Sequence, residues 1–171
     1  MSAPWAGAVA VAEGALCYLG ALADADTHHH VATQLVRAWS GTFELTDGHG
    51  RTAVASAAVI PSGCEHSIRI LEPHVAGVLV FVDPALTIDP GPAHAVAVEQ
   101  WVAAGHALNG WREPSVSDPA VVLTGFLAAL PERSRRADWH PSVRAAVALI
   151  TQGLPGPVGL AATARAVSMS P

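Results

Sequence analysis

Three consecutive histidines, His28, His29 and His30, and the nearby Gln34 are the side chains of this sequence best suited to bind a metal ion. On a β-strand, residues two apart share a face, so we expect His28, His30 and Gln34 to point to one side and His29 to the other. Two imidazoles at this spacing can occupy two positions around one cation. The segment therefore predicts one wall of a metal site, with His29 on the outer surface.

A third ligand has to come from a distant strand. Residues 61–66, PSGCEH, read as a turn followed by a strand that delivers His66. Cys64 has the same strand parity as His66 and is a candidate thiolate ligand, although neighbours after a turn need not both reach inward. Neutral imidazole suits Zn, Ni, Cu or Fe, whereas an amide oxygen is a weaker ligand than the usual carboxylate. We expect one divalent transition metal ion, Zn or Ni first, held by His28, His30, His66 and Gln34.

The same side chains also have a purely structural interpretation. His28 and His30 could be core or rim histidines without a metal, and Gln34 could hydrogen-bond a buried backbone group or an effector. The other histidines have no partner at a ligand spacing and are expected to be solvated; they are His49, His74, His94, His106 and His140. Both interpretations of the histidine pair remain open from the sequence.

Short β-type runs position these residues. Apolar or alternating segments recur at intervals of about ten residues from residue 7 to 83, with turn sequences such as Asp47-Gly48 between them. This spacing is typical of a sandwich or a small barrel. We predict a mainly β domain over residues 1–92.

The pattern becomes helical from residue 93. Residues 117–130 are the clearest case, because Ser117 or Asp118 can cap a helix and Pro119 suits its first turn. Residues 93–108 and 140–154 also have helical character. We predict a helical linker or dimerisation region over 93–156, so the chain is α+β overall.

Composition limits the class of protein. The 171 residues are 51% apolar and 13% charged, which supports a packed globular domain. No apolar run approaches the roughly 20 residues needed to span a bilayer. The apolar N-terminus lacks a basic residue and contains Glu13, so it does not resemble a signal peptide. Cys17 and Cys64 are too few for a disulfide framework, and we expect a cytoplasmic protein without a membrane partner.

Charge is distributed unevenly along the chain. Residues 1–100 hold ten acidic residues against three arginines, a net charge of −7, whereas residues 101–171 hold four against six, a net charge of +2. An acidic first half does not attract nucleic acid. The cluster of Arg133, Arg135 and Arg136 is interpreted as a solvated linker rather than a phosphate contact.

Two spaced motifs resemble those of the cupin family. The spacing His28-x-His30-x3-Gln34-x6-Gly41 is similar to the first cupin motif, with Gln in place of Glu, and Pro61-x-Gly63-x2-His66 is similar to the centre of the second. Leu22 and Ala55 stand where the motifs would open with glycine, and Ile70 stands where the second would close with asparagine. The resemblance implies a cupin-like double-stranded β-helix barrel. The missing carboxylate argues against the enzymatic form of that fold.

Motif order along nearly the whole chain resembles an AraC-type transcriptional regulator. In that family a cupin-like barrel precedes helices that serve dimerisation, then a Leu-Ala-x-x-Ala helix, a turn and a Ser-Pro that opens the recognition helix. Residues 160–164, LAATA, and Ser170-Pro171 match this start of a helix-turn-helix. The resemblance implies that residues 157–171 begin a truncated DNA-binding domain, and that only the full-length protein would bind operator DNA.

We therefore expect the effector- or metal-sensing domain of an AraC-type regulator, a homodimer paired through its helical region, and not an enzyme. Trp39, Phe43 and Cys64 are candidate effector contacts around the histidines, because inward side chains of a small barrel determine what fits. A metal-dependent cupin enzyme using His28, His30 and His66 is the alternative. A third possibility is a dimerisation scaffold with a vestigial pocket.

Overall fold

A computed structural model of the chain describes residues 5–86, 97–113 and 118–129. The chain divides into a unit of Met1–Arg135 and a second unit of Arg136–Pro171, and the second lies outside the described residues. Within the described ranges, no helix combines the length and the apolar character needed to cross a membrane.

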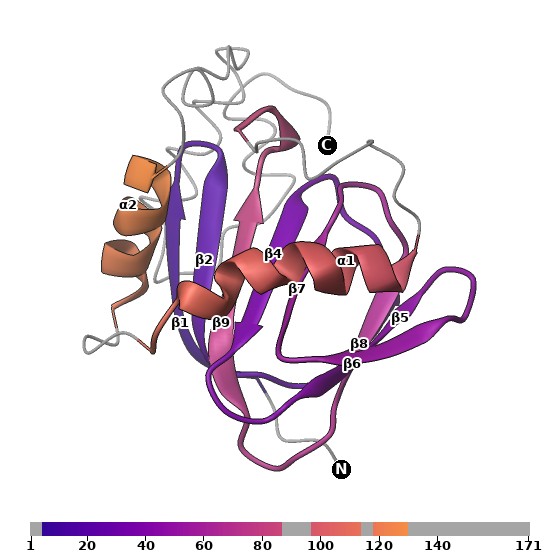
Figure 1. Ribbon diagram of the computed structural model, residues 1–171. Helices are drawn as coiled ribbons and strands as arrows, with labels where there is room; N and C mark the ends of the chain where they lie inside the picture. Colours follow the sequence, from indigo (N-terminus) through magenta and orange to yellow (C-terminus); the bar gives the residue numbers. More distant parts are fainter. Residues whose placement is uncertain (1–4, 87–96, 114–117, 130–171) are drawn as a thin grey trace, which may run out of the picture. The chain divides into compact units, whose positions relative to one another are not determined.

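Nine strands make up two antiparallel sheets in the described part of the chain (Figure 1). The five-stranded sheet has the order β1 (Ala6–Ala12), β2 (Ala15–Ala21), β9 (Ala76–Val82), β4 (Thr33–Ala38) and β7 (Ala57–Ile60). The four-stranded sheet has the order β3 (Ala25–His28), β8 (His66–Ile70), β5 (Phe43–Asp47) and β6 (Thr52–Ala55). Ser56 alone separates β6 from β7, so the chain passes from one sheet to the other with one residue between the strands.

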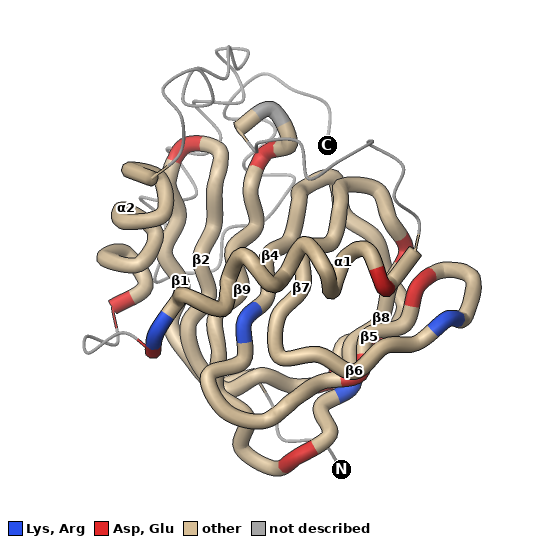
Figure 2. Tube along the Cα trace, viewed as in Figure 1, with Lys and Arg blue, Asp and Glu red and all other residues tan. Residues whose placement is uncertain are grey.

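Alternating apolar residues from both sheets form one core. On β5, Phe43, Leu45 and Asp47 are buried while the residues between them are half-buried. Phe43 and Leu45 pack in a cluster with Val36 of β4 and Ile60 of β7. Charged residues lie mainly in turns and near strand ends (Figure 2). The interior between the sheets is therefore almost uncharged, which determines the electrostatics of any site built there.

The described residues also form two α-helices and two 3-10 helices, labelled η. η1 is Pro84–Leu86, α1 is Val98–Gly105, η2 is His106–Gly110 and α2 is Pro119–Ala129. Helix α1 contacts β7, β6, β4 and β5, and so bridges both sheets, whereas α2 lies beside β1 and β2 (Figure 1). At Gly105 the backbone of α1 comes so close to β7 that an added Cβ would lie 2.4 Å from the Ala57 carbonyl oxygen. Close packing there fixes the position of the helix.

The mainly β class, followed by helices, is confirmed. The predicted helix over 93–108 is α1 and η2, and the helix over 117–130 is α2, where the Asp118 carboxylate accepts a 2.9 Å bond from the Ala120 N–H. Strand β3 was missed as an element of its own. The predicted helix over 140–154, the segment 157–171 and the arginine cluster lie outside the described residues, and so does the boundary at residue 92. These domain limits stay predictions.

Candidate metal centre

Three histidines from separate elements meet at one end of the barrel. His28 is the last residue of β3, His30 lies in the loop before β4, and His66 is the first residue of β8. His28 and His66 are direct partners across the β3–β8 pair. One ring nitrogen from each of the three lies within 4.8 Å of the others. The ring centroids are 4.4 Å apart for His28 and His66, 5.1 Å for His30 and His66, and 5.7 Å for His28 and His30.

The prediction that His28, His30 and Gln34 share one face of one strand is wrong. The chain leaves the four-stranded sheet at His28 and enters the five-stranded sheet at Thr33, so strand alternation does not carry across residues 29–32. The side chains converge instead because the two sheets face each other at this point. His29 is exposed, as expected.

Backbone carbonyls orient all three rings. Nδ1 of His28 lies 2.6 Å from the Asp26 carbonyl oxygen, and Nδ1 of His66 lies 2.9 Å from that of Cys64. Nδ1 of His30 lies 2.8 Å from the Ala32 carbonyl oxygen. A carbonyl oxygen only accepts, so each Nδ1 carries a proton, and in the neutral form of each ring the lone pair is on Nε2. This is the tautomer in which an imidazole binds a metal through Nε2.

Gln34 completes the group from β4, where it is 2% exposed. Its Oε1 lies 2.7 Å from Nε2 of His30 and 3.2 Å from Nε2 of His66. His66 is 1% exposed, and burial, reinforced by His28 and His30, lowers its pKa to about 4 against the opposing effect of its bond to Cys64. A neutral His66 ring carries one N–H proton, but its two nitrogens face two acceptor oxygens, the Cys64 carbonyl and Oε1 of Gln34. A cation between the nitrogens and Oε1 resolves this conflict, as does turning the amide so that its NH2 donates to the rings.

The donor set therefore fits a divalent transition metal: three imidazole nitrogens held in the correct tautomer and one amide oxygen. Phe81 of β9 stands edge-on to His30 at 5.1 Å, and Trp101 of α1 stands edge-on to His66 at 6.4 Å. These two rings make the inner boundary of the site apolar. Sequence reasoning missed both, since nothing in their spacing related them to the histidines.

Two hydrogen bonds join the loop of His30 to the turn that precedes β8. The Gly63 N–H donates to the His30 carbonyl at 2.8 Å, and the Ser62 hydroxyl donates to the Val31 carbonyl at 2.6 Å. Gly63 has a φ of 74°, which favours glycine. Val31 is 84% exposed, so the loop lies at the open side of the site. The turn thus positions His30 as well as His66.

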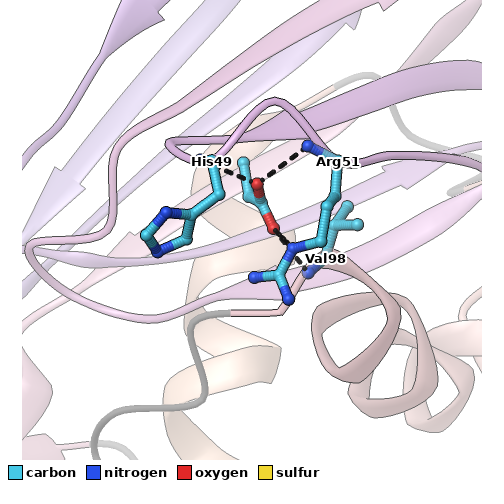
Figure 3. A network of polar contacts seen from close by, with 4 residues as sticks. His49, Arg51 and Val98 are labelled. Carbon is cyan, nitrogen blue, oxygen red and sulfur yellow. Dashed lines mark hydrogen bonds and ion pairs between the residues drawn. The ribbon is translucent and has the colours of Figure 1, made fainter.

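Asp47 is the other buried ionisable residue near His66, its partner across the β5–β8 pair. Its carboxylate does not belong to the histidine group. Oδ1 accepts from the backbone N–H groups of His49 at 2.9 Å and Arg51 at 3.0 Å, and Oδ2 accepts from Nε of Arg51 at 2.7 Å and from the Val98 N–H at 3.3 Å (Figure 3). Asp47 therefore caps the start of α1, the helix that carries Trp101.

The three residues predicted to contact an effector lie in different surroundings. Phe43 is fully buried in the core cluster, and Trp39 is half-buried, with its backbone N–H bonded to the Ala76 carbonyl. The Cys64 thiol is not part of the histidine group, and burial raises its pKa, which opposes thiolate ligation. The Cys64 carbonyl, rather than its sulfur, contacts His66.

The comparisons with known proteins concern the fold. No family model and no curated protein matches the chain. Oxalate decarboxylase from Bacillus subtilis matches with a TM-score of 0.34 and 23% identity, over 43% of this chain and 22% of that one. KdgF from Halomonas sp. matches with a TM-score of 0.34 and 26% identity, over 40% and 68%. The DMSP lyase DddQ from Ruegeria pomeroyi matches with a TM-score of 0.36 and 15% identity, over 45% and 42%.

The matched structures are cupin-fold proteins, and the predicted mainly β class with helices after it is confirmed by the two antiparallel sheets. The AraC-type identity stays a prediction. The prediction that the chain is not an enzyme is contradicted, because the matched structures with this fold include a decarboxylase and a lyase.

Proposed function

We propose that this chain is a metal-dependent cupin that binds one divalent transition metal ion through His28, His30 and His66, with Gln34 as a fourth ligand. The observation that carries the proposal is the convergence of three histidine rings whose Nδ1 atoms all face backbone carbonyls. This arrangement holds the Nε2 lone pairs in place before any ion arrives, so little ordering is needed on binding.

A bound divalent ion supplies a Lewis acid that polarises an oxygen of a bound molecule. The residues of the chain supply the rest. His66 and Gln34 are almost fully buried and keep water from the inner side, together with Phe81 and Trp101. His28 and His30 are half-buried, so a small molecule reaches the site from their side. An enzyme site has this form, with one open side and one apolar closed side.

Metal analysis of untagged protein tests the proposal. After incubation with Zn(II) and dialysis, we expect one equivalent of zinc in the wild type and a large loss in His30→Ala and His66→Ala. His29→Ala is the matched control, because His29 is exposed between two ligands and its removal should leave the zinc content unchanged. Less than about a tenth of an equivalent in the wild type, or equal losses in all three variants, would refute metal binding.

The resemblance of residues 157–171 to the start of a helix-turn-helix supports a second proposal, in which the same site senses a metal or small effector within an AraC-type regulator that acts as a homodimer. Coupling would then be a difference in effector affinity between two arrangements of the dimer. Fluorescence anisotropy of the protein expressed from the full reading frame, with DNA from upstream of its own gene and with and without Zn(II), tests this. A metal-dependent change in anisotropy supports the regulator, and no binding at low salt opposes it.

A further inference from the structure

The donor set of the metal centre carries no charge of its own. An imidazole binds a metal as a neutral ring, Gln34 contributes a neutral amide, and the only ionisable side chains in the ligand group within the described residues are histidines. Asp47 is the buried carboxylate nearest in register to the site, and its two oxygens already accept four bonds from other donors. A divalent ion bound here would therefore keep its full charge of +2.

In these surroundings a bound cation without a partner of opposite charge would be energetically unfavourable. The inner side of the site is formed by the rings of Phe81 and Trp101 and by the buried part of β4. Charges in an environment of low dielectric constant require a partner of opposite sign, and attract it more strongly than they would in water. Because the described residues supply no carboxylate ligand, we expect that partner to come from solution.

The open side of the site is suited to a small organic anion. His28 and His30 are half-buried, and the next residue, Val31, presents an exposed apolar side chain. A carboxylate would place an oxygen toward the cation and its apolar tail toward this rim.

We infer that Gln34 makes the site selective for a small carboxylate, because an amide in this position preserves the positive charge that a carboxylate side chain would cancel. This inference rests on the proposed metal binding and adds the class of molecule that the metal centre accepts. It also gives a role to Gln34, which stands where the first cupin motif has glutamate.

Visible absorption of the Co(II)-loaded protein tests the inference without any activity measurement. Acetate should change the Co(II) spectrum saturably, whereas acetamide, its uncharged isostere, should give less than a tenth of that effect at equal concentration. Gln34→Glu should retain Co(II) and bind acetate at least tenfold more weakly. Gln100→Glu makes the same chemical change at an exposed position of α1 and should leave the acetate affinity within a factor of two of the wild type.

Three outcomes would overturn the inference while leaving metal binding intact: equal responses to acetate and acetamide, an unchanged acetate affinity in Co(II)-loaded Gln34→Glu, or an equal loss in Gln100→Glu. Failure of the wild type to bind Co(II) would instead overturn the proposed function and this inference together. Stoichiometric Co(II) binding, measured first, separates the two cases.

Discussion

Replacing Asp47 by asparagine should destabilise the protein far more than a typical change of one charge. The Asp47 carboxylate accepts four hydrogen bonds, one of them from the start of α1, and the residue is 4% exposed. An asparagine of the same shape keeps one oxygen for two of the donors and turns an NH2 group toward the other two. Hydrogen bonds to a charged group contribute about 1.5–3 kcal/mol each. Losing the two at the replaced oxygen should cost about 3–4 kcal/mol, toward the lower end of the summed range because the bond from Val98 is long at 3.3 Å.

The measurement is urea unfolding at pH 7, followed by tryptophan fluorescence. A loss of 3–4 kcal/mol is a large part of a typical stability of about 5–15 kcal/mol, and corresponds to a fall in Tm of roughly 10 °C for a chain of this size. Glu44→Gln is the matched control. Glu44 lies on the same strand and pairs with Arg69, whose side chain is 64% exposed, so this change should cost less than about 1 kcal/mol.

The destabilisation caused by Asp47→Asn should also depend on pH, and it should decrease at low pH. Burial raises the pKa of Asp47, but the N–H groups of Arg51, His49 and Val98 and the Arg51 guanidinium together lower it below its usual value of 3.8. A lowered pKa in the folded state gives stability that is present above the unfolded pKa and is lost as the pH falls through the folded pKa. The difference between wild type and Asp47→Asn should be constant from pH 7 to about 5 and should shrink below 3.8. A loss no larger than that of Glu44→Gln, or a difference that persists at low pH, would refute the capping role.

Three further predictions concern single residues. Gly63→Ala and Gly50→Ala should each lower the free energy of unfolding by about 1 kcal/mol, because both glycines have φ above 70° and no atom within 4 Å of an added Cβ. Only Gly63→Ala should also weaken zinc binding in an equilibrium titration, because the Gly63 N–H holds the loop of His30. Gly105→Ala should cost more than about 2 kcal/mol in urea unfolding, because its Cβ would meet the backbone of β7. Cys17 is fully buried with a pKa raised to about 11, so it should react with a thiol reagent at pH 8 only after unfolding.

Spacing in the sequence was enough to predict the members of the histidine group, but for a partly mistaken reason. Strand alternation was expected to bring His28 and His30 together, whereas the two belong to a strand end and a loop between sheets. Their convergence depends on the bend between residues 28 and 33, which local periodicity does not encode. The turn at residues 61–66 was predictable, because its proline and glycine have defined backbone preferences.

The surroundings of the site could not be predicted in the same way. Asp47 was interpreted as part of an Asp-Gly turn, and it does accept bonds from that turn. Its bond to Val98 joins residues 51 apart in the chain, and the position of Trp101 over His66 depends on that anchored helix. Such contacts follow from how the elements pack, so a single sequence carries no local signal for them.

The order of strands has a consequence for how the chain folds. Among the described strands, β9 is the last in the sequence, yet it lies between β2 and β4 in the middle of the five-stranded sheet. Until residues 76–82 have been synthesised, β2 and β4 each lack a neighbour and expose an edge, which is largely apolar in β2. Folding must therefore wait for non-local pairing, which is typically slow, and the nascent chain is open to edge-to-edge association during that interval.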